Sequence, residues 1–283
     1  MGVNVRKVLY GRHKWRLYLL LILILTACTP AAPQVKRIAL LTSFEGRYRE
    51  IGYDAIYPLR LALKDADSDV VLVTVDDGGT AESALIQARR LAADPTILAA
   101  LVIGPTATQP DVLAAFGDVP VIVIGAWDAT PSETVFVLAS ENLRSVRTSH
   151  AKTIGVAVEA AAPLTGGELF ALKQYADLRP NLDGITVALS ASPPDSAFTE
   201  RLIASDLFVP TPGALSSITY DVGGLIQAVT QSEISRDGVK TALKTIEYTG
   251  LNGQISFTTA GWWDDAPILE YSYSNGVLTL RVP

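Results

Sequence analysis

The fold is decided by residues 70–105, whose sequence is VVLVTVDDGGTAESALIQARRLAADPTILAALVIGP. The continuous apolar run at 70–75 is typical of a strand that is buried on both faces in a parallel sheet. Thr80 ends the following turn and is a residue type that caps helix N-termini. Apolar residues then recur at helical spacing over 84–92. A second run of strand length covers 98–103, so the stretch predicts a strand–helix–strand unit.

The flanking sequence repeats this alternation. Apolar runs of strand length occur at 37–41 and 119–124, and helical patterns occur near 55–66 and 111–116. Pro58 lies inside the first of these helices and is expected to kink it or to delay its start. Strands that alternate with helices form βαβ units, so the sequence predicts an α/β fold with a parallel, Rossmann-like sheet and helices on both faces.

Ligands of such sheets bind where loops leave the carboxyl ends of the strands. Three loops are therefore candidate binding segments, at 42–48, 104–108 and 125–130.

The remainder of the chain is less regular. The motif Ser274-Asn275-Gly276 between two apolar runs predicts a hairpin. In Trp262-Trp263, we expect one indole in the core and the other over a strand edge, although a partner surface is an alternative. The further strands are expected at 135–138, 185–189, 254–258, 268–273 and 277–282, and the further helices at 142–160, 196–206, 219–232 and 237–246.

Composition excludes several classes of function. The chain has 283 residues and a net charge of −6, yet its first 27 residues hold five basic residues and no acidic one, which leaves −11 on the rest. This negative charge on residues 28–283 disfavours nucleic-acid binding. One cysteine and two histidines exclude a Cys/His zinc site. No dinucleotide, P-loop or nucleophile-elbow motif is present, so we expect no cofactor and no metal.

The first 28 residues have the pattern of an export signal. Basic residues precede the apolar run Leu17–Leu25, which is about half the roughly 20 residues that span a bilayer. Leu25-Thr26-Ala27-Cys28 follows and resembles the bacterial lipobox, which implies cleavage before Cys28 and a lipid on its sulfur. Residues 1–27 are then a signal peptide and 28–34 a tether, on an exported protein anchored to the cell membrane or envelope. The alternative is an ordinary cysteine after a membrane anchor.

Four segments in this order are similar to type I periplasmic solute-binding proteins, in the branch that holds branched-chain amino-acid receptors of ABC transporters. They are 38–46, 76–105, 119–126 and 220–257, the last opening at Tyr220-Asp221 and ending at Tyr248-Thr-Gly-Leu-Asn-Gly-Gln-Ile-Ser-Phe257. The resemblance implies two lobes that close on a solute. Lobe one would comprise 35–134 and 215–250, and lobe two 135–214 and 251–283.

The resemblance also implies the residues that bind the solute. Small hydroxyls and free backbone N–H groups suit a carboxylate, and an acidic side chain suits an ammonium group. Trp127 is either a stacking surface or a plug between the lobes, and Asp128 is alternatively a solvated loop residue. The expected ligand-binding residues are Ser43, Phe44, Tyr48, Thr106, Ala126, Trp127 and Asp128.

The chain departs from that family by its length, because two central βα units of lobe two are missing. Asp195 is a candidate acid at the edge of the reduced cleft. The expected function is capture of a small polar solute, an amino acid or similar, for an ABC permease or a sensor. The alternative is an envelope lipoprotein whose degenerate binding fold takes a protein partner. An enzyme is not expected, since Ser149 and His150 are adjacent and point in different directions on a helix.

Overall fold

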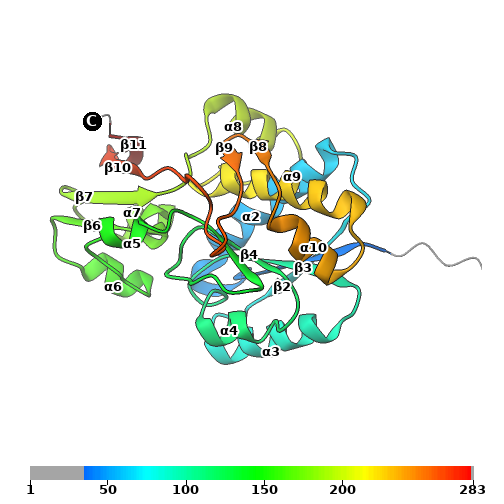
Figure 1. Cartoon of the computed structure of the whole chain (residues 1–283). Helices are drawn as coiled ribbons and strands as arrows, with labels where there is room; N and C mark the ends of the chain where they lie inside the picture. The colour runs from blue at the N-terminus through cyan, green and yellow to red at the C-terminus, as the bar shows by residue number, and fades with distance from the viewer. Residues whose placement is uncertain (1–34, 282–283) are drawn as a thin grey trace, which may run out of the picture. The chain divides into compact units, whose positions relative to one another are not determined.

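A parallel sheet of five strands organises the described residues, 35–281, of the computed structural model (Figure 1). The strand order is β2-β1-β3-β4-β5, and every neighbouring pair is parallel. The predicted α/β fold with a parallel sheet is therefore confirmed. The strands are β1 (Arg37–Thr42), β2 (Val71–Asp76), β3 (Ile97–Val102), β4 (Val121–Ile124) and β5 (Val135–Leu138).

Helices cover both faces of this sheet (Figure 1). Side chains alternate along a strand, so Ile38 and Leu40 of β1 pack in one apolar cluster while Ala39 and Leu41 pack in another. The first cluster includes α2 (Arg49–Asp65), α9 (Ser216–Ser232) and α10 (Arg236–Leu243), and the second includes α3 (Ala81–Ala93) and α4 (Pro110–Ala114).

One local prediction is wrong, and one of the two alternatives for Pro58 is excluded. The run at 70–75 is not buried on both faces, because β2 is the edge strand, and Val71 is 43% exposed. Pro58 does not delay the start of its helix, since α2 begins at Arg49 and continues through the proline. Thr80 does cap α3, where its side chain accepts a hydrogen bond from the N–H of Ser83 at 3.2 Å.

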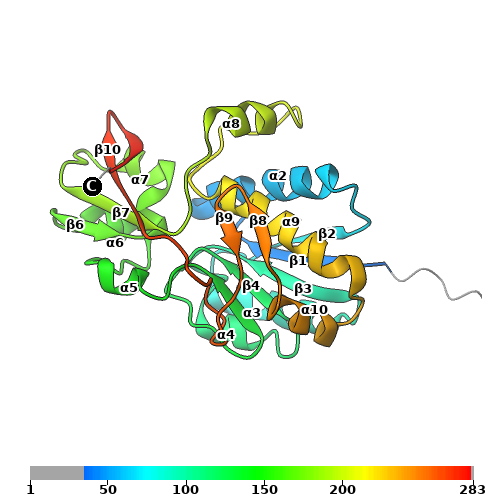
Figure 2. The same ribbon diagram turned by 45° about the horizontal axis from the view of Figure 1, so that its top comes forward.

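A second, smaller sheet has the order β11-β10-β7-β6 (Figure 2). Only β6 and β7 in it are parallel, and β10 and β11 form the predicted hairpin, with positive φ at Asn275 and Gly276. This small sheet agrees with a reduced second lobe. Its strands are β6 (Leu164–Gly166), β7 (Ile185–Leu189), β10 (Leu269–Ser274) and β11 (Val277–Leu280), and a separate pair is formed by β8 (Tyr248–Gly250) and β9 (Gly253–Ile255).

The single helix predicted at 142–160 is wrong. The structure has two short helices there, α5 (Leu143–Val146) and α6 (Ile154–Glu159). The backbone N–H groups of Thr148 and Ser149 donate instead to the carbonyl of Thr165, and Thr153 starts α6 as its cap. The other helical segments are η1 (Gly46–Tyr48), η2 (Glu168–Ala171), α7 (Lys173–Leu178) and α8 (Ser196–Ile203).

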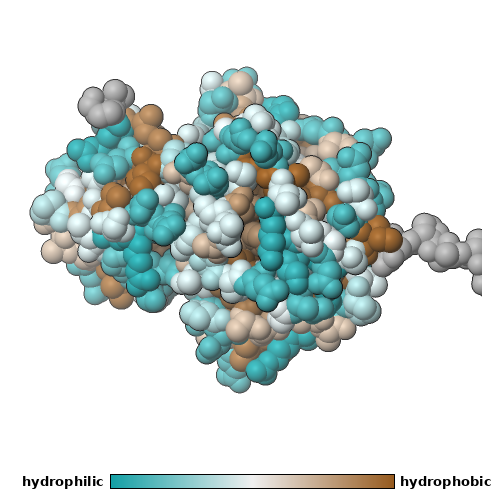
Figure 3. All heavy atoms as spheres, in the orientation of Figure 1, coloured by the Kyte–Doolittle hydropathy of each residue, from teal (hydrophilic) through white to brown (hydrophobic). Residues whose placement is uncertain are grey.

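The outer face drawn in Figure 3 is covered mainly by hydrophilic and neutral residues, with hydrophobic ones in small groups. Trp263 is buried, as expected for one of the paired indoles, and its Nε1 donates to the carbonyl of Gln254 at 2.9 Å. Within residues 35–281 no helix has both the length and the apolar character to cross a membrane. The predicted signal peptide, tether and lipid site at Cys28 lie outside the described residues.

Candidate functional site

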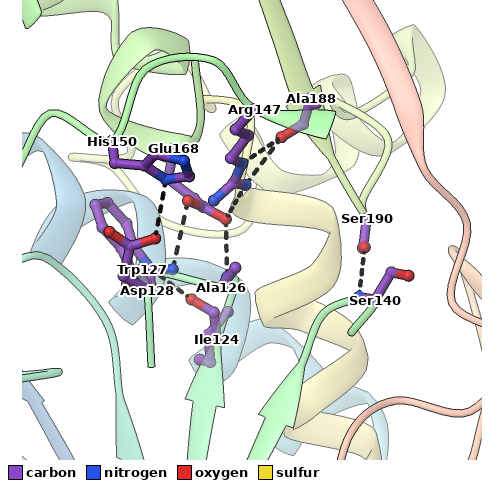
Figure 4. A network of polar contacts seen from close by, with 10 residues as sticks. All are labelled: Ile124, Ala126, Trp127, Asp128, Ser140, Arg147, His150, Glu168, Ala188 and Ser190. Carbon is purple, nitrogen blue, oxygen red and sulfur yellow. Dashed lines mark hydrogen bonds and ion pairs between the residues drawn. The ribbon is translucent and has the colours of Figure 1, made fainter. Parts of the chain in front are cut away.

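A buried carboxylate, that of Glu168, lies at the centre of a polar network that joins the loop after β4 to the second sheet (Figure 4). Its Oε1 accepts hydrogen bonds from the N–H of Ala126 at 2.8 Å and from Nη2 of Arg147 at 2.9 Å. Its Oε2 accepts from the N–H of Trp127 at 3.4 Å. Three donors from two separate segments therefore converge on one carboxylate.

The backbone of the β4 loop explains why these N–H groups point the same way. Gly125, Trp127 and Asp128 all have positive φ, at 86°, 46° and 58°. This left-handed region is uncommon for residues other than glycine and costs of order 1–3 kcal/mol for each. The indole Nε1 of Trp127 donates to the carbonyl of Ile124 at 2.7 Å, which holds the loop in this conformation.

Arg147 completes the network from the second sheet. It is 7% exposed, and its Nε and Nη2 donate to the carbonyl of Ala188 at 3.3 and 2.9 Å. Burial favours the neutral acid, but the guanidinium of Arg147 and the N–H of Ala126 outweigh it and lower the pKa of Glu168. Glu168 is consequently a carboxylate at neutral pH, and the pair is ionic.

A cavity of about 340 Å³ adjoins this network at the carboxyl ends of β3 and β4. The loops after these strands contribute Pro105, Thr108, Trp127 and Asp128, and the opposite side is formed by 147–153 and 167–170. Nδ1 of His150 lies 3.6 Å from Oδ1 of Asp128 across the cavity wall (Figure 4). The lining thus combines an indole ring, carboxylates, an imidazole, the basic side chains of Arg147 and Lys152 and small polar groups, as binding pockets for polar molecules do.

Part of the predicted site comes together here. Trp127 and Asp128 line the cavity, and Ala126 lies beneath it with its N–H on Glu168. Thr106 is buried between the lining residues Pro105 and Thr108.

The residues predicted on the first loop do not line this cavity. The hydroxyl of Ser43 donates to the carboxylate of Asp77 at 2.9 and 3.0 Å. The ring of Phe44 packs edge-on against Tyr53, and the hydroxyl of Tyr48 accepts from the N–H of Ile154 at 3.1 Å. Their contribution to binding stays a prediction. Asp195, the other candidate acid, caps α8 by accepting from the N–H of Phe198 at 2.7 Å.

Sequence reasoning missed Arg147 and Glu168. The two residues are 21 positions apart in the chain, so no local signal joins them. Within residues 35–281, no three carboxylate, imidazole or thiol groups cluster in a way that could hold a metal ion.

No family model matches the sequence, and neither does any curated protein. Solved structures do match. A leucine-binding protein from Thermotoga maritima aligns at a TM-score of 0.65 and 12% identity, over 88% of this chain and 98% of its own. An ABC-transporter substrate-binding protein from Desulfitobacterium hafniense, in complex with Leu, aligns at 0.64 and 13%, over 87% and 99%.

A third matching structure holds a ligand of a different kind. It is a solute-binding protein of an R. palustris ABC transporter in complex with benzoate, at a TM-score of 0.60 and 15% identity, over 86% of this chain and 94% of its own. At such identities the likeness shows the fold alone, which is the type I periplasmic-binding-protein fold expected from the sequence.

Proposed function

We propose that this protein is an extracytoplasmic lipoprotein that captures a small polar solute, an amino acid or similar, for an ABC transporter or a sensor. The observation that carries the proposal is the cavity of about 340 Å³ at the carboxyl ends of β3 and β4. Ligands of open α/β sheets bind at this edge, and the solved structures with the same fold include complexes with leucine and benzoate.

The cavity supplies recognition groups and no catalytic set. Trp127 offers an apolar ring against which a solute can lie, and Asp128 offers a carboxylate that suits an ammonium or hydroxyl group. His150 both donates and accepts hydrogen bonds in its neutral form. The proposed activity is binding, without bond chemistry.

The anchor rests on the leader sequence. We propose that Cys28 is lipidated and holds the protein at the outer face of a membrane, with residues 28–34 as the tether. A Cys28→Ser variant expressed in bacteria should fail to incorporate a labelled fatty acid that wild type incorporates. Equal labelling of the two proteins would contradict lipid attachment at this residue.

Ligand-dependent thermal unfolding tests solute capture. Residues 29–283 are melted against a panel of amino acids, small carboxylates, amides and nucleosides. A solute at a hundredfold excess over its Kd stabilises by about 2.7 kcal/mol, which raises the Tm by about 5–10 °C. The shift should disappear in Trp127→Ala and Asp128→Ala and persist in Asp206→Ala, which changes an exposed aspartate outside the cavity lining.

A second function is favoured by one surface feature. Leu207 and Phe208, in the loop after α8, are 86% and 76% exposed, and paired apolar side chains of this kind suit a protein partner. On this alternative the chain is an envelope lipoprotein with a degenerate binding fold. A cooperative melt that no solute shifts, together with an envelope partner lost in Phe208→Ser, would favour it over solute capture.

A further inference from the structure

We propose that Glu168 is a resident carboxylate that fills an anion-binding site of the chain, so that a solute in the adjacent cavity binds without placing a carboxylate on the N–H groups of the β4 loop. What the inference says about a solute rests on the proposed function. What it says about the carboxylate rests on the hydrogen bonds of Glu168.

The network has the composition of a carboxylate-binding site. Two backbone N–H groups, of Ala126 and Trp127, and one guanidinium, of Arg147, donate to the two oxygens of Glu168. Backbone N–H groups and arginine are the donors that proteins use for free carboxylates. Glu168 is 3% exposed and occupies the point on which these donors converge.

The role of Glu168 as an acceptor explains the conformation of the loop after β4. The positive φ values from Gly125 to Asp128 aim two consecutive N–H groups at one point, and that point is occupied by Glu168. Without an acceptor there, the two N–H groups would lose their partner and the buried guanidinium of Arg147 would lose its counter-ion, each at a cost of about 1–3 kcal/mol or more. The site thus requires an anion, and the chain supplies it.

The groups that remain for a solute carry both signs. Asp128 and the indole of Trp127 line the cavity, and so do the basic side chains of Lys152 and His150. An ammonium or hydroxyl group of a solute suits a carboxylate beside an aromatic ring. A carboxylate of the solute would bind at the basic side chains, because Glu168 already occupies the donors of the β4 loop.

Chemical rescue tests the inference. Glu168→Ala shortens the side chain and opens the three donors to the cavity, which Glu168 itself lines. Tm is measured for residues 28–283 with Cys28→Ser, in sodium acetate against sodium chloride at equal ionic strength. With acetate at about tenfold excess over its Kd, the Tm of Glu168→Ala should rise by about 3–6 °C. Wild type and Glu168→Gln, which keeps the volume and one acceptor oxygen, should not respond.

The outcomes separate the two proposals. A folded Glu168→Ala that ignores acetate overturns the resident carboxylate, as does a wild type that binds carboxylates through these donors. If wild type binds no solute but acetate raises the Tm of Glu168→Ala, solute capture is contradicted and the resident carboxylate is supported. If Glu168→Ala does not refold in chloride, the refolding yields of Glu168→Ala and Glu168→Ser in acetate become the readout, and equal yields in both salts overturn the inference.

Discussion

Two buried carboxylates, Glu168 and Asp54, show how neighbouring groups decide the charge state of an acid. Glu168 has a guanidinium at 2.9 Å, and its pKa is lowered. Asp54 forms no ion pair with any residue of 35–281; it accepts from the N–H groups of Gly213 and Leu215 and from the hydroxyl of Ser216. Burial dominates there and, with help from Glu50, raises its pKa to about 6 in spite of these hydrogen bonds.

Arg147→Met should lower the free energy of unfolding by about 3–5 kcal/mol, because it leaves Glu168 charged and buried without its partner. Arg281→Met is the matched control: Arg281 pairs with Glu270 at 3.1 Å, but both side chains are largely exposed, so the loss should stay below about 1 kcal/mol. Urea unfolding of both variants measures the difference. Equal losses would show that the buried pair does not stabilise the fold in the way argued.

Asp54 predicts a specific dependence of stability on pH. Its folded pKa lies above its unfolded value of 3.8, so its contribution is complete below about pH 4 and is lost as the pH rises through about 6. Against Asp54→Asn, which does not titrate, wild type should lose about 3 kcal/mol over this interval. Urea unfolding of both proteins at pH 4, 5, 6 and 7 measures it, and a constant difference would contradict the shifted pKa.

At the scale of elements, the crossing of α2 and α9 depends on Gly223. A Cβ at this residue would lie 2.5 Å from Cβ of Ala62 and 3.4 Å from the carbonyl of Leu59, so the two helices would have to separate. Gly223→Ala should destabilise by about 1–3 kcal/mol, although alanine is the better helix former.

Gly155 in α6 provides the control for this prediction. A Cβ there has its nearest neighbour, Nη1 of Arg47, at 4.0 Å, and its φ is not in the positive range. Gly155→Ala should therefore gain up to about 1 kcal/mol. Chemical denaturation of the two variants should give changes of opposite sign; a stabilised Gly223→Ala would mean that the helices do not pack as closely as described.

How far the sequence predicts these elements depends on whether their signal is local. The strands β1, β3 and β4 are buried on both faces, and their continuous apolar runs indicate this burial in the sequence. Thr80 and Asn275-Gly276 are likewise local signals, for a cap and a turn. By contrast, β6 is three residues long, and the break between α5 and α6 follows from N–H groups that bond to Thr165. Such partners become neighbours only after folding.

The residues of the candidate site also divide into those with a local sequence signal and those without one. Trp127 and Asp128 were predictable because they follow a strand of the parallel sheet. The Arg147–Glu168 pair was not, since two charged residues in irregular segments usually point to solvent. Only the three-dimensional structure shows that both are buried at the end of β4.

At the scale of the whole described chain, one apolar cluster extends from the five-stranded sheet to the second sheet. Phe136 of β5, Leu169 and Phe170 of η2 and Tyr271 of β10 are all buried members of it. The N–H of Ser140, after β5, also donates to the hydroxyl of Ser190, after β7, at 2.8 Å (Figure 4). The two sheets are therefore joined by buried apolar contacts and hydrogen bonds, as are the strands within each sheet.

A shared core predicts that both sheets unfold together. Phe170 is buried in this core, its ring lies 4.9 Å from that of Tyr175, and its carbonyl accepts from the hydroxyl of Tyr273 at 2.6 Å. Guanidinium unfolding should give one transition, with tryptophan fluorescence and far-UV circular dichroism coinciding. Phe170→Ala should shift that single transition by about 3–5 kcal/mol in both signals, because removing a buried ring leaves a cavity. If the two signals separate in wild type, the second sheet folds as an independent unit; if they separate only in Phe170→Ala, this ring couples the two sheets.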